Sequence, residues 1–354
     1  MKDFKYYLSA ILVFFTISSC NVLDEEPFTQ PSTENFYQNE TDALAALTAS
    51  YARLKSGVGY YKQQFMPTLF ASSDQGLSTY LYNEFKRGIV TSTNQSLNNL
   101  WKELYLGIRE ANNVIANVPN IDMDEELKHR IIGEAKFLRA LHYFNLVRCF
   151  GEVPLRTSPV EAGDDQGLAV STIVEIYDSI IDDLNYASLH CWGRNESRGN
   201  YTNDLGRATN TSAHALLAKV YTGIASCKRS ASDGVLGNEL YLQFSESYQS
   251  YYQYAKDHSD SAILGQGFNL SSSLEDWVSI FDADNGNNNE MIFDIQGSSL
   301  SGQGTAVSNL FTPRNAGLSG SGFGGNNKLK PLFINNMIDK FDNRYQNSII
   351  TQYE

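Results

Sequence analysis

The sequence predicts a mainly α-helical protein in which antiparallel helix pairs stack into an α-α superhelix, with long loops and a few short strands. Up to about residue 265, apolar residues recur three and four positions apart, which is the period of amphipathic helices. Capping residues mark where these segments begin and end. Short turns join some of the segments, and this makes the joined helices antiparallel neighbours. Any repeated unit is degenerate, because the sequence shows no strict internal period.

The first two helices are expected at 39–56 and at about 96–118. Asn39 can cap the first of them, and Gly57 can end it. The second carries a continuous apolar stripe and stops at Pro119, which cannot continue a helix. Both helices therefore have one face suited to burial.

A third helix is expected over about 122–150, with Asp122 as its cap and Glu125 completing a capping box. It is apolar on two faces, which predicts a position between two layers of helices. Its charged residues make insertion into lipid costly. Among them, Glu134 and Arg139 are expected to tie helices together rather than to catalyse a reaction.

Three more helices are expected at 172–187, 209–227 and 245–264, the first opened by a capping box of Thr172 and Glu175. Residues 39–265 thus form the helical region. From residue 266 the pattern changes to a short helix, a polar loop and a strand at Met291–Ile295. Residues 297–330 are rich in Gly, Ser and Asn and predict a long surface loop.

The N-terminus has the layout of a bacterial lipoprotein signal. Residues 1–19 combine two early lysines with an apolar run that is too short to span a bilayer as a mature helix. Residues 17–20, Ile-Ser-Ser-Cys, match the lipobox at which a lipoprotein peptidase cuts just before the cysteine. We therefore expect a lipidated Cys20 followed by a tether at 20–38. The acidic residues 24–26 in this tether resemble an export tag for the outer face of the outer membrane.

Composition and spacing argue against several classes of function. The formal net charge of −13 leaves no basic surplus for binding nucleic acid. Five scattered histidines show no metal-ligand spacing, and there is no G-x-S-x-G nucleophile motif. The G-x-G-x-x-G match at 320–325 lacks the flanking strand and helix of a nucleotide site. The segment from Asp282 to Glu290 offers oxygen ligands for a weak Ca²⁺ site or is a hydrated turn. We expect no enzymatic activity, resident metal or cofactor.

Two loops offer the mixture of aromatic and polar side chains that recognises sugars, in which rings stack on sugar faces and amides and charges bond the hydroxyls. The first loop lies between the first two helices, and the second is the Gly-rich loop. Trp192, in the polar stretch HCWGRNESRGNY, is a further exposed candidate, whereas Trp101 lies on a helical stripe and is expected in the core. The alternative is that the loop residues are ordinary loop side chains or contacts to a partner protein. The candidate ligand-binding residues are Asp74, Tyr80, Tyr82, Asn83, Arg87, Trp192, Phe311, Arg314, Phe323 and Asn327.

Several motifs in order carry a resemblance to a known family. They include LDEEP after the lipobox, LWKELYLGIREANNVI, GEAKFLRALHYFNLVRCFGEVPL, GRATNTSAHALLAKVY, NNNEMIFDI and DNRY. Together they cover nearly the whole chain, which resembles the SusD/RagB family of outer-membrane lipoproteins. The resemblance implies a scaffold of tetratricopeptide-like helix pairs without enzymatic activity.

The same resemblance implies a function and a partner. Family members capture glycans at the cell surface, some capture peptides, and they deliver their cargo to a SusC-like TonB-dependent transporter. The chain is thus expected to be anchored to the outer membrane by its N-terminal lipid alone, facing outwards. A peptide- or siderophore-capturing lipoprotein, a hydrolase and a purely structural lid remain alternatives. Members usually continue well past DNRY, so a chain that ends nine residues after Tyr345 is expected to be truncated, with 266–354 an incomplete C-terminal region.

Overall fold

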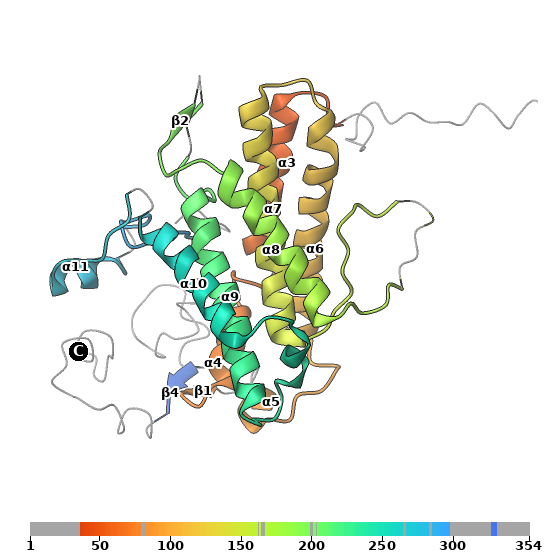
Figure 1. Ribbon diagram of the computed structural model, residues 1–354, viewed down its shortest axis with the longest axis vertical. Helices are drawn as coiled ribbons and strands as arrows, with labels where there is room; N and C mark the ends of the chain where they lie inside the picture. Colours follow the sequence, from red (N-terminus) through yellow and green to blue (C-terminus); the bar gives the residue numbers. More distant parts are fainter. Residues whose placement is uncertain are drawn as a thin grey trace, which may run out of the picture. The chain divides into compact units, whose positions relative to one another are not determined.

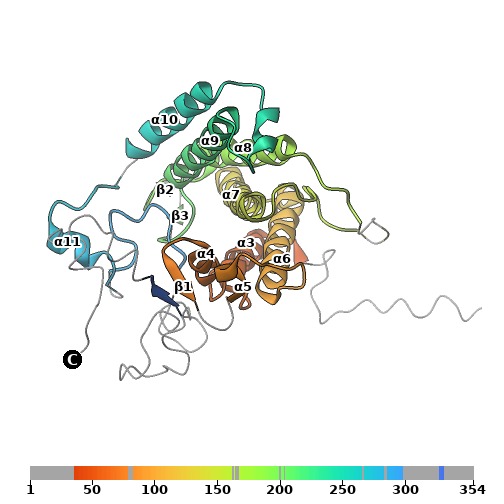
Figure 2. The ribbon, with the colours of Figure 1, turned by 90° about the horizontal axis from the view of Figure 1, so that it is seen from below.

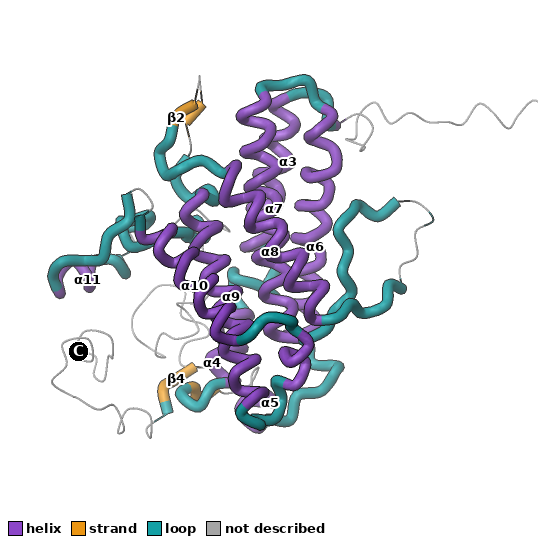
Figure 3. The backbone as a smooth tube through the Cα atoms, viewed as in Figure 1, coloured by secondary structure: helices purple, strands orange, loops and turns teal. Residues whose placement is uncertain are grey.

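Helices dominate the computed structural model (Figure 3). It describes residues 36–78, 83–161, 163, 167–198, 201–202, 204–264, 267–282, 285–297 and 327–330. The α-helices are α3 (Glu40–Ala52), α4 (Phe65–Ser72), α5 (Asn83–Arg87), α6 (Gln95–Asn117), α7 (Glu125–Phe150), α8 (Ile173–His190), α9 (Asn210–Ser232), α10 (Tyr248–Ile263) and α11 (Leu274–Ser279). Short 3₁₀ turns are η1 (Arg53–Lys55), η3 (Val118–Asn120) and η4 (Glu239–Gln243).

The long helices pack in succession, as expected for stacked helix pairs. α3 packs on α6, α6 on α7, α7 on α8, α8 on α9 and α9 on α10. Figure 1 shows these helices side by side, and the view along them in Figure 2 shows α7 between α6 on one side and α8 and α9 on the other. The prediction of a mainly helical fold is confirmed.

α7 forms the centre of the core, as its two apolar faces predict. Nineteen of its 26 residues are buried, including the charged Glu134 and Arg139. A helix with neighbours on several sides buries residues that would face solvent in a surface helix. Buried charges at these positions need partners, because an unpaired charge in the interior is very costly.

Arg139 connects α7 to α8 through hydrogen bonds. Its Nε donates to Asp183 Oδ2 at 2.7 Å and its Nη2 donates to Asp183 Oδ1 at 2.8 Å, a bidentate arrangement. Its Nη1 also donates to the Asn112 side chain of α6 and to the Thr157 carbonyl, both at 2.8 Å. One side chain thus joins three helices and the segment that follows α7, so the predicted tying role is confirmed.

His142, also on α7, is buried without such partners. Within the described part of the chain neither of its ring nitrogens has a hydrogen-bond partner, and burial lowers its pKa to about 3. The ring fills the space over Gly107 of α6. A Cβ at Gly107 would stand 2.2 Å from His142 Nε2, so a glycine is required there for α6 and α7 to approach each other.

Several predicted helix starts are confirmed. Asn39 caps α3 by accepting the Asp42 N–H at 3.1 Å, and Thr172 and Glu175 form the expected capping box of α8. The cap of α7 was predicted wrongly. Asp124, not Asp122, accepts the Leu127 N–H at 2.9 Å, because the helix begins only at the residue that follows Asp124.

The strand predicted at Met291–Ile295 is wrong. These residues are irregular, and the Phe293 ring packs against Phe137 of α7, with ring centroids 4.9 Å apart. The β-rich composition of this stretch therefore reflects packing against a helix rather than pairing with a strand. The strands that do form are short: β1 (Gly76–Ser78) pairs with β4 (Asn327–Leu329), and β2 (Ser197–Arg198) pairs with β3 (Tyr201–Thr202).

Short helices and later helix ends also differ from the sequence-based expectation. The loop predicted between the first two helices contains α4 and α5, and α9 continues to Ser232 rather than ending near residue 227. Across the described ranges, no helix combines the length and apolarity needed to cross a bilayer. Cys149, Cys191 and Cys227 are free thiols.

Candidate ligand-binding site

A two-stranded antiparallel ribbon joins the two loops that the sequence singles out for ligand binding. In the β1–β4 pair, Gly76 lies opposite Leu329, Leu77 opposite Lys328 and Ser78 opposite Asn327. The paired residues lie about 250 positions apart in the sequence. Neither strand has the length or the alternation by which a sequence predicts a strand. Figures 1 and 2 place the ribbon beside α4, near the ends of the long helices.

α4 holds the ribbon in place through the turn that follows it. Ser73 Oγ donates to the Phe70 carbonyl at 2.8 Å and accepts the Gly76 N–H at 3.2 Å. Gly76 is required by this close approach, since a Cβ there would stand 2.0 Å from the Phe70 carbonyl oxygen. On the opposite strand, the Lys330 N–H donates to the Gln75 carbonyl at 2.8 Å. The ribbon is therefore fixed to the helical scaffold at its base.

A buried polar pair closes the other end of the ribbon. Ser78 and Asn327 are 1% and 2% exposed, respectively. In the described ranges, the Ser78 hydroxyl and both side-chain amide atoms of Asn327 have no hydrogen-bond partner. Leaving a buried polar group unpaired costs about 1–3 kcal/mol, so such groups in native proteins call for an explanation. An amide and a hydroxyl are the groups that bond sugar hydroxyls.

The other predicted residues of the two loops are distributed around this ribbon or lie outside the described residues. Asp74 is exposed at the turn before β1, Asn83 begins α5 and Arg87 is exposed at its end. Asn94 Nδ2 donates to Glu84 Oε2 at 2.9 Å and so ties α5 to the start of α6. The candidates that lie outside the described residues are Tyr80, Tyr82, Phe311, Arg314 and Phe323.

The two tryptophan predictions are both wrong. Trp192, expected as an exposed candidate, is 0% exposed, with the Arg130 guanidinium 4.6 Å and the Arg198 guanidinium 5.7 Å from its ring centroid. Two cations flank the indole and fix the loop to the helices, which gives this residue a structural role. Trp101, expected in the core, is 36% exposed because it lies at the edge of the apolar stripe of α6.

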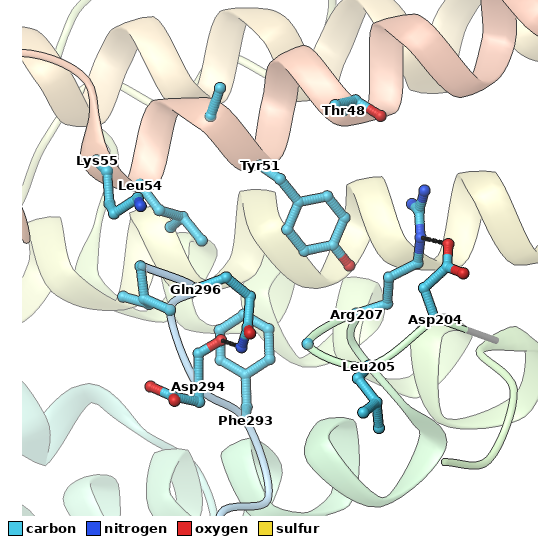
Figure 4. Close-up of a pocket in the computed structure, with 13 residues that line it drawn as sticks. Thr48, Tyr51, Leu54, Lys55, Asp204, Leu205, Arg207, Phe293, Asp294 and Gln296 are labelled. Atoms are coloured by element: carbon cyan, nitrogen blue, oxygen red, sulfur yellow. Dashed lines mark hydrogen bonds and ion pairs between the residues drawn. The ribbon is translucent and has the colours of Figure 1, made fainter. Parts of the chain in front are cut away.

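A second concave region lies between α3 and the segments around residues 206 and 294. It is a cavity of about 360 Å³ in which Figure 4 shows Tyr51 and Phe293 on opposite sides, with Arg207 and Asp204 at one end. Arg207 Nε donates to Asp204 Oδ2 at 3.2 Å. No sequence motif singled out this cavity, because its walls come from three distant segments.

Beneath this cavity lies a buried network centred on Glu134, which is 0% exposed. Tyr51 Oη donates to Glu134 Oε2 at 2.6 Å, Arg130 Nε to Oε1 at 2.7 Å and Arg207 Nη1 to Oε2 at 3.3 Å. Burial, together with the neighbouring Glu134 carboxylate, raises the pKa of Tyr51 well above its usual value. The Tyr51 hydroxyl also accepts the Ala208 N–H at 2.8 Å.

These groups hold neighbouring segments together through hydrogen bonds. Burial lowers the pKa of Arg207, but the neighbouring Glu134, Tyr51 and Asp204 together outweigh this effect, so that the pKa is raised. Tyr51 and Arg207 thus keep their protons at neutral pH, which suits recognition of a ligand and not acid–base chemistry.

The described residues provide no group of three or more His, Cys, Asp or Glu side chains that could hold a metal ion. Within the stretch considered for Ca²⁺, residues 283 and 284 lie outside the described residues. Two oxygen-bearing side chains of this stretch are engaged by the backbone: Glu290 Oε1 accepts the Ser271 N–H at 2.5 Å and Asn288 Oδ1 accepts the Glu290 N–H at 3.0 Å.

Comparison with known proteins places these features in a family. Residues 22–222, more than half of the chain, match a SusD-like family model described as "Starch-binding associating with outer membrane". SusD-like protein P2 of Formosa agariphila is 28% identical over 246 residues, which are 66% of this chain and 46% of that protein. A SusD-like protein of Bacteroides ovatus is 26% identical over 299 residues, 84% of this chain and 50% of that protein. The chain spans about half the length of these curated relatives.

Solved structures share the fold. A SusD superfamily protein from Parabacteroides distasonis superposes with a TM-score of 0.69 at 23% identity, covering 89% of this chain and 62% of that one. A protein described as a laminarin-binding SusD-like protein gives a TM-score of 0.60 at 27% identity, covering 79% of this chain and 58% of that one. The helical scaffold described above is therefore the scaffold of these proteins.

Proposed function

The chain belongs to the SusD-like family, and from this premise we propose that it is a non-enzymatic, glycan-binding lipoprotein of the cell surface. Its ligand is an oligosaccharide or polysaccharide. One relative of the same fold, at 27% identity, is described as laminarin-binding, which makes a β-glucan a reasonable first probe.

The single observation that supports the proposal most is the β1–β4 ribbon. It brings together two loops, each with aromatic and polar residues, that the sequence alone selects for sugar binding. At their meeting point lies Asn327, a buried amide without a hydrogen-bond partner among the described residues. A sugar hydroxyl supplies both a donor and an acceptor, which is what such an amide needs.

The proposal extends to anchoring and delivery. Residues 1–19 are a signal that is removed, lipid attaches to Cys20, and residues 20–38 form a tether to the outer membrane, with the protein facing outwards. The helical region 39–265 and the region from 266 onwards present the ligand to a SusC-like TonB-dependent transporter. The outer-membrane association in the family description agrees with this arrangement.

Replacing Asn327 with alanine is expected to weaken glycan binding about 5- to 30-fold, because the sugar hydroxyls lose a buried amide partner worth about 1–2 kcal/mol. Isothermal titration calorimetry with laminarin, starch and a wider panel of neutral polysaccharides measures the change. Asn185, an exposed asparagine of α8, provides the matched control, and Asn185→Ala is expected to bind like the parent protein.

Three outcomes would contradict the proposed function or the proposed site. If no saccharide of the panel binds while a peptide library does, the protein captures peptides on the same scaffold. If reducing ends accumulate when the protein is incubated with a polysaccharide, it is a hydrolase. Unchanged binding in Asn327→Ala, with glycan affinity present in the parent, would place the site away from the ribbon.

Replacing Cys20 with serine is expected to abolish incorporation of radiolabelled palmitate and to release the protein from the membrane fraction, because the proposed anchor consists of acyl chains on this residue. Fractionation of expressing cells, with labelling, measures both effects. Retention of the label in Cys20→Ser would contradict lipidation at this residue.

A further inference from the structure

The outer side of α6 carries a separate groove, away from the β1–β4 ribbon and from the cavity beside Tyr51. It encloses about 350 Å³ between α6 and the segment that follows α7. Its apolar lining includes Trp101, Tyr105, Leu106 and Val160, and its charged lining includes Lys102 and Arg109. A volume of this size lies within the range of small-ligand sites.

Aromatic rings form the floor of this groove. Trp101 and Tyr105 are one helical turn apart, with centroids separated by 5.0 Å and planes inclined at 44°. Phe150 meets the Trp101 ring edge-on at 5.1 Å and supports it from the side. Because Trp101 is 36% exposed, part of its indole stays accessible at the surface, and tryptophan and tyrosine side chains are enriched at binding interfaces.

Hydrogen bonds hold both walls of the groove rigid. Tyr105 Oη donates to the Pro154 carbonyl at 2.8 Å, and Asn112 Nδ2, from α6, donates to the Arg156 and Ser158 carbonyls at 3.1 Å each. Tyr143 Oη donates to the Arg156 carbonyl at 2.9 Å. The extended segment 154–158 is thus fixed against α6. A groove that is shaped before binding loses less entropy when it takes up a ligand.

The charge of the groove is opposite to that of the protein as a whole. The lining includes Lys102, Arg109 and Arg156, and none of its described residues is acidic, although the chain has a net charge of −13. Glu110, which pairs with Arg109 at 2.7 Å, also pairs with Arg53 at 3.0 Å. One carboxylate shared by two guanidinium groups leaves a positive charge in excess, and this favours an anionic ligand.

From these observations we propose that the α6 groove is a second saccharide site, selective for sugars that carry a carboxylate or sulfate group. The sugar ring stacks on Trp101, and its anionic group lies between Lys102 and Arg109. The aromatic floor explains why the ligand is a sugar, and the cationic rim explains why it is charged. This inference extends the proposed glycan binding, but it depends on residues that the ribbon site does not use.

The test compares a linear galacturonic acid oligomer with a neutral galactose oligomer of the same length, titrated into the full chain. We expect the acidic oligomer to bind at least 10-fold more tightly, and its affinity to fall as NaCl is raised, because salt screens the cationic rim. Trp101→Ala is expected to weaken acidic-oligomer binding about 10-fold or more. The double variant Lys102→Glu/Arg109→Gln is expected to remove the preference for the acidic oligomer.

The controls separate this site from the ribbon site and from misfolding. Lys256→Glu, an exposed charge reversal on α10, is expected to keep the preference, and Asn327→Ala is expected to leave acidic-oligomer binding unchanged. Trp101→Phe, which retains an aromatic face, is expected to restore most of the affinity lost in Trp101→Ala. Equal binding of both oligomers, unchanged binding in Trp101→Ala, or tighter binding of oligoglutamate than of the galacturonic acid oligomer would each overturn the proposal. The last result would assign the groove to an acidic protein segment.

Discussion

Replacing Glu134 with alanine is expected to lower the free energy of unfolding by about 3–5 kcal/mol, the range found when one partner of a buried ion pair is removed. Glu134 is 0% exposed and accepts from Tyr51, Arg130 and Arg207. Without the carboxylate, Arg130, which is 3% exposed, keeps its charge in the interior but loses its ion pair with Glu134. Urea denaturation followed by circular dichroism measures the change as a shift of the midpoint at constant slope.

Glu125→Ala provides the matched control for this variant. Glu125 lies on the same helix and also forms an ion pair, with Lys128 at 2.6 Å, but its side chain is 70% exposed. Exposed pairs contribute about 0–1 kcal/mol, so the control is expected to unfold at nearly the parent urea concentration. Equal losses in the two variants would contradict the central role assigned to Glu134.

The second large effect concerns acid stability and depends on His142. Because folding lowers the pKa of this residue to about 3, the unfolded chain takes up the proton first as the pH falls below about 6.5. Above pH 6.5 the ring is neutral in both states, and its protonation does not lower the free energy of unfolding. Between pH 6.5 and pH 3 the unfolded chain is protonated and the folded chain is not, so the free energy of unfolding falls progressively. The loss amounts to about 1.4 kcal/mol for each pH unit within this window.

His142→Leu removes this titration. The free energy of unfolding of the variant is therefore expected to fall less steeply with decreasing pH than that of the parent protein, by the loss per pH unit given above. Unfolding free energies from urea titrations between pH 7.5 and pH 4 measure the difference. The carboxylates titrate in both proteins and cancel in the comparison. Asn185→Ala, an exposed substitution that involves no titrating group, is expected to follow the parent curve. Parallel curves for the parent and His142→Leu would contradict the assignment.

Much of the fold could be predicted because it depends on local patterns. The α8 capping box and the two apolar faces of α7 are sequence features that persist in the structure, since burial and capping favour the same local conformation. The ribbon could not be predicted, because two three-residue strands carry no periodic signal and pair only through long-range packing. At 291–295 the opposite error occurred, because a strand was predicted where none forms. Phe293 of this stretch packs on α7 instead of pairing with another strand.

The candidate site was predicted in composition but not in geometry. The sequence selected two loops for their residue types, and Asn327 was among their members, yet nothing in the sequence indicates that Asn327 lies opposite Ser78. The predictions for the two tryptophans were wrong for a physical reason. A polar loop can bury its indole under arginines, as at Trp192, and a helical stripe can end at the surface, as at Trp101. Sequence pattern reports the average environment of a segment and not that of each side chain.

The β1–β4 ribbon is expected to form after the helices during folding. The cost of closing a loop rises with the logarithm of its length, and contacts between distant residues form late in folding. The helices depend on contacts between residues that are near in the sequence, so they can form before residues 327–329 are available. The ribbon cannot form until these residues are present. The ligand site that we propose at the ribbon is therefore completed last. A chain interrupted before that point would retain the helical array but would lack this proposed site.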